Sequence, residues 1–321
     1  MLFYHPHGAA GDSAPAAETV WIDLLDPTEA EIRLIEDHCG HRVPTLQDLS
    51  EIERTSQLIV DGQVLRLSTP VIAKADTAEP ELSYLGMILT PELLVTVRFE
   101  KLKVFEDAAE RACPQGRESS SMAAFVVLME AVVDRQADLL ERVRGKLDEI
   151  SRRVFRAPSN GAGPGKTPRE KDVLRRHLRA LGDSGERVSM IRDSLLGVGR
   201  IAPFVQENAK DWISPEHATR LHAVSLDIES LNQFEGHLSG KVQFLLDAVL
   251  GFINIEQNDL FKVLTIASVV GIPPTLVASM YGMNFHDMPE LGWKYGYPYG
   301  LGVIALATIL PILWFKWRRW L

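Results

Sequence analysis

The residues best suited to chemistry form a short motif near the end of the chain, Tyr281-Gly282-Met283-Asn284-Phe285. Glycine can adopt the positive φ that ends a helix, so we expect Gly282 to end one. Asn284 then presents a neutral amide oxygen just beyond that helix end. Such an oxygen can bind a cation directly or through the water shell of the cation. Gly-x-Asn is also a common helix stop, and the surroundings of the motif decide between the two interpretations.

The rest of the chain offers little catalytic chemistry. It contains no Gly-rich phosphate loop, HExxH or GxSxG motif, and Asp23, Asp26 and Asp48 are isolated carboxylates at expected strand ends and caps. The two cysteines, Cys39 and Cys113, are far apart, which excludes a disulfide framework or a multi-cysteine zinc module. The formal net charge of -9 argues against nucleic acid as a partner. A membrane-anchored enzyme or sensor that uses the N-terminal part is a remote alternative.

Two long uncharged runs close the chain, at residues 263–285 and 295–315. Each reaches the roughly 20 residues that cross a hydrocarbon core of about 30 Å. A short polar loop joins them, and aromatic residues flank them as interfacial belts do. We expect both runs to span a membrane, the alternative being a pair of buried core helices. The flanking residues are Trp293, Tyr295, Tyr297 and Tyr299 at one edge and Trp314, Trp317 and Trp320 at the other.

The distribution of cations predicts the orientation of the two spans. The tail, residues 316–321, carries three cations, whereas the loop between the spans, residues 286–294, carries two carboxylates and one firm cation. The positive-inside rule therefore places the tail in the cytoplasm, and two spans place the N-terminus on the same side. The first fifteen residues lack a cationic region and an apolar core, so we expect no signal peptide.

The first 120 residues indicate a small α/β domain. Short β-branched runs bounded by turn residues predict strands, and a mixed sheet with helices packed on it is the expected result. Helical periodicity then predicts a helical region over 121–213, with two helices joined by a flexible segment. The strands are expected at 18–25, 57–60, 64–73, 84–89 and 93–99, and the helices from Glu29 to about Cys39, over 121–156 and over 170–196, with the flexible segment at 157–166.

The next helix has the most regular pattern of the chain. Ser214 and Pro215 form a start signal, and we expect one helix to run from residue 214 through a stalk at 214–262 into the first span. Its apolar residues alternate spacings of three and four, with Glu235 at the one missing step. The partner of this seam is either an antiparallel helix of the same chain, such as 121–156, or identical helices of neighbouring subunits. Because a monomer would leave the seam largely exposed, we expect an oligomer. The seam consists of Leu221, Val224, Ile228, Leu231, Leu238, Val242, Leu245, Val249 and Phe252.

The string YGMNF, followed by MPEL between two C-terminal spans, closely resembles the CorA magnesium transporter family. The resemblance extends through LLDAVLGFIN and NDLFKVLTI upstream and GWKYGYP downstream, and WIDLLDPTEAE near the N-terminus is similar to the same family. It implies a homopentameric divalent-cation channel of the bacterial inner membrane, with both termini in the cytoplasm. A funnel of α/β domains would lead through stalk helices into a pore lined by the first span.

The resemblance also implies roles for particular residues. Gly282, Met283 and Asn284 would form a selectivity ring at the external mouth. Asp247 would belong to an intersubunit regulatory Mg²⁺ site, and Asp76 is the candidate for the partner carboxylate. The residues expected to face the pore are Asn258, Phe261, Leu264, Ile272 and Thr275.

The chemistry of Mg²⁺ agrees with these roles. The ion holds its water tightly and prefers octahedral oxygen ligands, so a neutral ring of amide oxygens can bind the hydrated ion and still release it. Leu264 and Ile272 would give an apolar throat that closes by dewetting. Mg²⁺ bound at Asp247 would hold the closed state, and its loss would let the subunits splay within the assembly. No cofactor is expected beyond Mg²⁺ as the transported and regulatory ion.

Other divalent ions are also candidates for transport by the same scaffold. Zinc or cobalt transport is the nearest alternative, but the intact Gly-Met-Asn and a single nearby histidine, His286, favour Mg²⁺, with Co²⁺ and Ni²⁺ as further candidates. The sequence departs from the family at Phe261, at Ser279 and at Pro273-Pro274, where a single proline is usual. Two prolines are expected to accentuate the break in the hydrogen-bond ladder of the helix.

Overall fold

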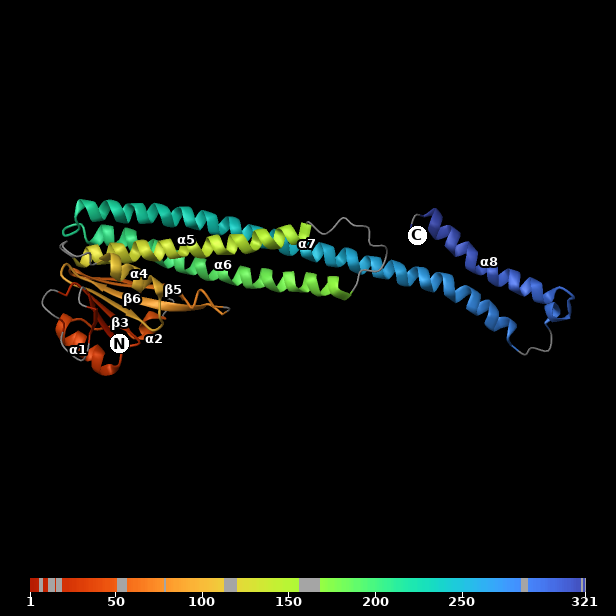
Figure 1. Cartoon of the computed structure of the whole chain (residues 1–321), viewed down its shortest axis with the longest axis horizontal. Coiled ribbons are helices and arrows are strands. Elements are labelled where there is room, and N and C mark those ends of the chain that lie inside the picture. Colours follow the sequence, from red (N-terminus) through yellow and green to blue (C-terminus); the bar gives the residue numbers. More distant parts are fainter. Residues whose placement is uncertain are drawn as a thin grey trace. The chain divides into compact units, whose positions relative to one another are not determined.

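The computed structural model describes residues 1–5, 8–10, 15, 19–50, 57–77, 79–112, 120–155, 168–283, 288–318 and 320. It divides into two compact units, an N-terminal unit at Met1–Leu246 and a C-terminal unit at Asp247–Leu321. The sheet and most of the helices belong to the N-terminal unit (Figure 1). Helix α7 (Pro215–Tyr281) begins in this unit and ends in the other.

A seven-stranded sheet forms the base of the N-terminal unit. Its spatial order is β2-β1-β3-β7-β6-β5-β4, and only β3 and β7 among these described strands pair in parallel. The predicted mixed sheet is therefore confirmed. Gly62, with φ 62°, occupies the two-residue loop between β4 and β5, where a tight hairpin needs positive φ. The strands are β1 (Leu2–His5), β2 (Gly8–Ala10), β3 (Trp21–Leu25), β4 (Leu58–Asp61), β5 (Val64–Ala73), β6 (Glu81–Leu89) and β7 (Leu94–Arg98).

Helices cover both faces of this sheet (Figure 1). On one face lie α1 (Glu29–Cys39) and α2 (Leu46–Leu49), and on the other lie α4 (Lys103–Ala112), α5 (Ser121–Phe155) and α6 (Pro168–Asn208). The apolar core between α1 and the sheet includes Ile35 from the helix and Ile22, Leu24, Val95 and Val97 from the two central strands. Alternation along β3 then turns Trp21 and Asp23 to the opposite face, toward α4.

Four short elements have no counterpart among the predicted ones: β1, β2, α2 and α4. The two strands are four and three residues long and α2 is a single turn, which is too short for a hydrophobic period to appear. α1, in contrast, was predicted with its correct end at Cys39. It begins with a capping box between Thr28 and Glu31 and ends at Gly40 with φ 68°.

Helix α6 ends at Asn208, well beyond the predicted end near Leu196. The glycines that follow Leu196 do not stop the helix. A Cβ atom on Gly197 would lie 2.3 Å from Thr69 Oγ1 and 2.7 Å from Pro70 Cδ, so glycine permits the close packing of α6 on β5. The flexible segment predicted at 157–166 lies outside the described residues.

Helix α7 starts as predicted, with the backbone N–H of His217 donating to Ser214 Oγ at 3.2 Å. Its seam is buried in the single chain from Leu221 to Leu245, apart from the partly exposed Leu231. The expectation that a monomer leaves this seam largely exposed was therefore wrong. Spacing by three and four also arises when one helix packs on two neighbours of the same chain.

Ion pairs and close contacts identify α5 and α6 as those neighbours. Arg220 of α7 binds Glu130 of α5 through two hydrogen bonds of 2.8 and 2.7 Å. The buried Glu235, at the polar step of the seam, lies 3.4 Å from Arg192 of α6. The packing of α7 on α5 and α6 thus explains the seam without a second subunit.

The C-terminal unit contains the end of α7, the short helix η1 (Pro289–Gly292) and α8 (Gly296–Trp317). Both α7 and α8 contain an 18-residue window with a mean hydropathy of 1.8, and 0% and 6% of these windows are buried. The alternative of two buried core helices does not fit this exposure. α7 stays helical through Pro273 and Pro274, although neither proline has a backbone N–H to donate to the hydrogen-bond ladder.

Candidate ion-conduction segment

Short-range backbone hydrogen bonds close the end of α7, where the described part of the motif lies. The N–H of Gly282 donates to the carbonyl oxygens of Ala278 at 3.1 Å and Ser279 at 3.2 Å, and the N–H of Met283 donates to Met280 at 3.2 Å. The helix therefore ends by tightening into a three-residue turn.

Gly282 ends α7 as expected, because the helix stops at Tyr281, but it does so without the positive φ that glycine permits. A Cβ atom at Gly282 would lie 3.4 Å from the carbonyl oxygen of Ala278, close but not prohibitive. Gly282 and Met283 are both exposed in the single chain. Asn284, the third residue of the predicted selectivity ring, lies outside the described residues.

The described part of the loop after this motif is tied to the start of α8. A Cβ atom on Gly296 would lie only 2.0 Å from the carbonyl oxygen of Glu290, so the approach of η1 to α8 requires glycine there. The ring of Trp293 packs edge-on against Tyr299, with ring centroids 5.9 Å apart. Glu290, the only carboxylate among the described loop residues, therefore lies in a turn that packs against the start of α8.

The five residues predicted to face a pore share one side of α7. At about 100° per residue, their positions fall within about 120° of the circumference of an undistorted helix. All five are exposed in the single chain, so no described residue of this chain covers that side. They are Asn258, Phe261, Leu264, Ile272 and Thr275.

This side of α7 has an apolar middle and polar ends. Phe261, Leu264 and Ile272 are each more than 60% exposed, although they lie on an apolar helix. The hydroxyl group of Thr275 donates to the carbonyl oxygen of Gly271 at 2.7 Å, which leaves the lone pairs of Thr275 Oγ1 as acceptors. An apolar stretch bordered by polar side chains with available acceptor lone pairs has chemistry suited to line the path of a hydrated cation.

Asp247 is exposed on α7, at the start of the C-terminal unit. Among the described residues, no three His, Cys, Asp or Glu side chains lie close enough together to hold a metal ion. A Mg²⁺ ion at Asp247 would therefore need ligands from another subunit or from water. The assignment of Asp247 to an intersubunit site stays a prediction.

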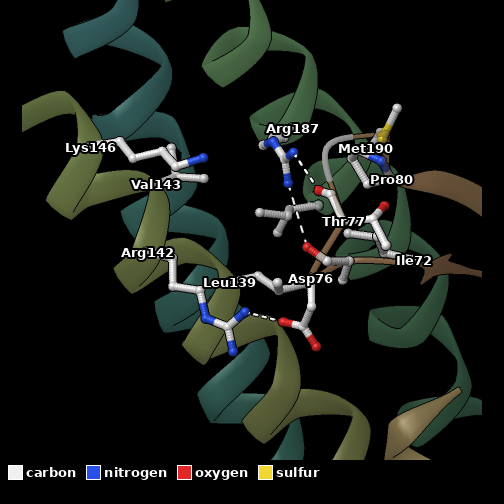
Figure 2. A pocket seen from close by; sticks show the side chains of 12 residues that line it. Ile72, Asp76, Thr77, Pro80, Leu139, Arg142, Val143, Lys146, Arg187 and Met190 are labelled. Carbon is white, nitrogen blue, oxygen red and sulfur yellow. Dashed lines mark hydrogen bonds and ion pairs between the residues drawn. The ribbon is translucent and has the colours of Figure 1, made fainter. Parts of the chain in front are cut away.

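Asp76, the candidate partner carboxylate, is held by two arginines of α5. Arg135 donates to it at 2.7 Å, and Arg142 forms a second ion pair, which Figure 2 shows beside the connection between β5 and β6. Hydrogen bonds from Arg142 and Arg135 lower the pKa of the Asp76 carboxyl below its ordinary value. A metal ion at Asp76 would have to compete with two guanidinium groups, so the structure does not favour that role.

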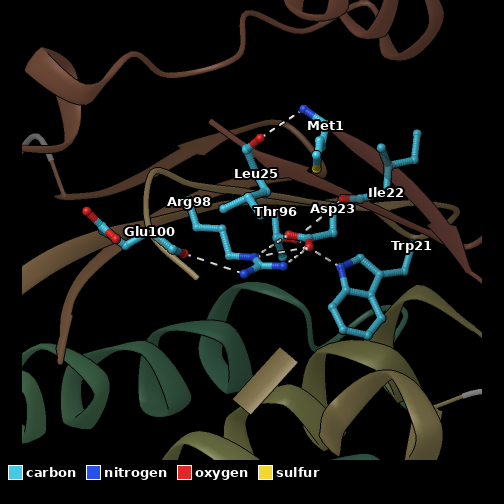
Figure 3. A network of polar contacts seen from close by, with 8 residues as sticks. All are labelled: Met1, Trp21, Ile22, Asp23, Leu25, Thr96, Arg98 and Glu100. Carbon is cyan, nitrogen blue, oxygen red and sulfur yellow. Dashed lines mark hydrogen bonds and ion pairs between the residues drawn. The ribbon is translucent and has the colours of Figure 1, made fainter. Parts of the chain in front are cut away.

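Two of the other isolated aspartates, Asp23 and Asp48, have structural roles. Asp23 is buried and accepts hydrogen bonds from Arg98 Nη2 at 2.8 Å and Nε at 3.1 Å, and from Thr96 Oγ1 at 2.8 Å (Figure 3). Asp48 caps α2, as its position suggested, by accepting from the N–H of Thr45 at 2.9 Å. The expectation for Asp23 as a solvated or capping group was wrong, because strand pairing brings Arg98 alongside it.

Comparison with known proteins identifies relatives along nearly the whole chain. The Magnesium transport protein CorA of Escherichia coli (strain K12) is 31% identical over 311 residues, which is 97% of this chain and 94% of that protein. The Magnesium transport protein CorA of Pasteurella multocida (strain Pm70) is 29% identical over 310 residues, 96% of this chain and 94% of the relative. These relatives are named as transport proteins, not as enzymes.

Solved structures agree on the fold. The CorA magnesium transporter from Methanocaldococcus jannaschii has a TM-score of 0.70 at 17% identity and covers 92% of this chain and 89% of its own. The full-length CmaX protein has a TM-score of 0.67 at 16% identity, with 95% and 89% coverage. At the level of sequence, the family model described as "CorA-like Mg2+ transporter protein" matches residues 16–318. The chain therefore belongs to the family of CorA-like Mg²⁺ transporter proteins.

Proposed function

We propose that the protein is a membrane transporter that conducts Mg²⁺ through a pore lined by α7. Family membership over residues 16–318 carries this proposal. The geometry of α7 supports it, because the five predicted pore residues share one side of a helix that the described chain leaves largely uncovered. The apolar windows of α7 and α8 have the length and hydropathy of membrane spans.

In this proposal the chain sits in the bacterial inner membrane with both termini in the cytoplasm. Tyr295, Tyr297 and Trp293 are exposed at one end of α8 and Trp317 at the other, where aromatic side chains would meet the two interfaces. Lys316 and Arg318 follow the second span on the cytoplasmic side. A homopentamer would place five copies of α7 around one axis, with the side that carries the five predicted pore residues turned inward.

Selection would take place at a ring of Gly282, Met283 and Asn284 at the external end of the pore. Five amide oxygens would bind the water shell of Mg²⁺ without a permanent negative charge. Weak binding of this kind lets the ion leave again, as conduction requires. Leu264 and Ile272 would form the throat that closes when intracellular Mg²⁺ is bound between subunits.

Ion flux into proteoliposomes tests the proposed transport. Mg²⁺, Co²⁺, Ni²⁺ and Zn²⁺ would be supplied in turn to vesicles that contain the purified protein, with protein-free vesicles as the blank. We expect Mg²⁺ flux well above the blank, and flux of Co²⁺ or Ni²⁺ to be carried by the same pore. Zn²⁺ flux without Mg²⁺ flux would replace the proposal with zinc transport on the same scaffold.

Asn284→Ala tests the selectivity ring. The variant removes the amide oxygen without changing charge, so we expect Mg²⁺ flux to be lost or strongly reduced while the mass of the detergent-solubilised assembly is unchanged. Asn208→Ala is the matched control, because Asn208 is an exposed asparagine at the end of α6 in the N-terminal unit. Full flux through a correctly assembled Asn284→Ala variant would exclude the proposed role.

A further inference from the structure

A cavity of about 240 Å³ opens in the N-terminal unit between the β5–β6 connection and helices α5 and α6 (Figure 2). Its apolar wall includes Leu139 and Val143 of α5 and Ile191 of α6. The wall is contributed by three separate elements of the fold, so the cavity is formed by the tertiary structure and not by a single loop. The proposed transport path in the C-terminal unit does not use it.

The charged side chains that line this cavity are mostly positive, whereas the chain as a whole has a negative net charge. Arg142, Lys146 and Arg187 line it together with one carboxylate, Asp76, although the formal net charge of the protein is -9. An adjoining cavity of about 250 Å³ shares Asp76 and Leu139 with it. The ionisable groups that this second cavity adds are all basic: Lys74, Lys101, Lys103 and Arg135. A concentration of cations in a recess raises the local concentration of anions.

The three cations of the first cavity differ in how far they are already engaged. Arg142 pairs with Asp76, and Arg187 donates to the carbonyl oxygens of Thr77 at 2.9 Å and Ala75 at 3.4 Å. Lys146 makes no ion pair or hydrogen bond with the described part of the chain. Figure 2 shows its ammonium group extending from α5 into the space that Arg187 faces from α6. Lys146 is thus the cation best available to a bound anion.

A buried acceptor beside the adjoining cavity lacks a partner among the described residues. Gln136 is 3% exposed and lines this cavity, and its Nε2 donates to Ser194 Oγ at 2.7 Å. Its carbonyl oxygen Oε1 is buried without any hydrogen-bond partner among the described residues. An unsatisfied buried acceptor is costly, so a shift of the Gln136 side chain that turns Oε1 toward the cavity and a hydrogen-bond donor of a ligand would be favoured.

We propose that these two adjoining cavities form a binding site for a nucleoside phosphate. The phosphate group would bind Arg142, Lys146 and Arg187, since guanidinium and ammonium groups are the usual protein partners of phosphate. The organic part would cover the apolar wall, and an amino group that extends into the adjoining cavity would donate to Gln136. The site goes beyond the proposed transport activity and is tested without any measurement of flux.

The test is equilibrium dialysis of the full-length protein in detergent with AMP as the probe. EDTA in the buffer removes divalent metals, so that metal-bridged binding cannot contribute. We expect saturable binding of AMP that is tighter than that of inorganic phosphate or adenosine alone, because only AMP fills both parts of the site. It should weaken as salt is added, since charge pairs carry it.

Lys146→Gln is the informative variant, because Lys146 is exposed and its loss should leave folding intact. We expect it to weaken AMP binding about tenfold, the effect of losing one charge-assisted hydrogen bond to phosphate. Arg144→Gln is the matched control: Arg144 is an exposed cation on the same helix, pairs with Asp148 at 3.8 Å and lines neither cavity. The absence of saturable AMP binding, an equal loss in both variants, or adenosine binding as tightly as AMP would each overturn the proposal.

Discussion

Single residues in the sheet show how a carboxylate becomes structural instead of catalytic. Asp23 and Arg98 are both less than 10% exposed and face each other across the parallel pair β3 and β7. Thr96 donates to Asp23 and accepts from Trp21 Nε1 at 3.0 Å (Figure 3). The guanidinium of Arg98 also lies 4.3 Å from the ring centroid of Phe105. The polar groups of this network find their hydrogen-bond partners within the network. Removal of one member therefore leaves another buried polar group without a partner.

Arg98→Met should destabilise the protein by about 3–5 kcal/mol, because it leaves the Asp23 carboxylate buried without its cation. The measurement is the midpoint of thermal unfolding of the full-length protein in detergent. The double variant Asp23→Leu with Arg98→Met should recover a large part of the loss, since both charges are then replaced by apolar groups. A double variant less stable than Arg98→Met would contradict this explanation.

The Asp23–Arg98 pair also shows what the sequence can and cannot reveal about single residues. The cap at Asp48 was predictable because its partner Thr45 lies three residues away. The role of Asp23 was not, because its partner lies 75 residues along the chain and only the strand register brings the two together. The end of α7 at Gly282 was predictable, but its backbone conformation was not, since glycine permits a positive φ without requiring one.

At the scale of elements, close packing of α6 on β5 depends on a residue without a side chain. Gly197 lies inside α6, where glycine is intrinsically unfavourable. It is accommodated because the backbone of α6 comes within contact distance of Thr69 and Pro70. Gly182 of the same helix serves no such contact, since a Cβ atom added there would meet no neighbouring atom within 4 Å.

These two glycines give a matched pair of predictions. Gly197→Ala should destabilise the protein by about 1–3 kcal/mol, because the new methyl group overlaps Thr69 Oγ1 and Pro70 Cδ. Gly182→Ala should stabilise it by about 0.5–1 kcal/mol through helix propensity alone. The midpoint of thermal unfolding in detergent distinguishes them, and a gain in stability for both variants would show that α6 is free to move away from β5.

The long elements were the most predictable part of the fold. The bounds of α5 and the start of α7 were predicted to within a residue or two. The apolar residues of α5 recur at a regular spacing, and the start of α7 is marked by residues next to it in the sequence. The end of α6 was missed because a glycine within a helix and a glycine after one look alike in sequence. The strand β5 was predicted over its full length, while β1, β2, α2 and α4 were too short or too polar to carry a period.

At the scale of the whole molecule, the apolar seam of α7 packs within one chain and is therefore no evidence for assembly of several chains. α5 and α6 cover the seam in the N-terminal unit, so the exposed apolar side chains that need another partner lie elsewhere, chiefly beyond residue 246. Among them, Leu264, Ile272 and Leu276 are at least 60% exposed. A lipid bilayer and further copies of the chain are the environments proposed for these residues.

Regulation of the proposed pore can be tested at Asp247, which is exposed on α7 between the two apolar residues Leu246 and Ala248. If Mg²⁺ binds there between subunits, it stabilises the closed assembly in proportion to its occupancy. Asp247→Asn removes a negative charge from every subunit and weakens the attraction for the ion. We therefore expect the variant to keep conducting at internal Mg²⁺ concentrations that close the wild type.

The measurement is Mg²⁺ inhibition of flux in proteoliposomes, together with protection by Mg²⁺ against proteolysis in detergent. The half-inhibiting concentration should rise severalfold for Asp247→Asn, and protection should require correspondingly more Mg²⁺, because both report the same ligand-stabilised state. Asp227→Asn is the control, as Asp227 is another exposed aspartate of α7 that lies in the N-terminal unit. Inhibition curves that coincide for Asp247→Asn, Asp227→Asn and the wild type would make Asp247 an ordinary surface charge. The pore would then have to close by a mechanism in which this carboxylate takes no part.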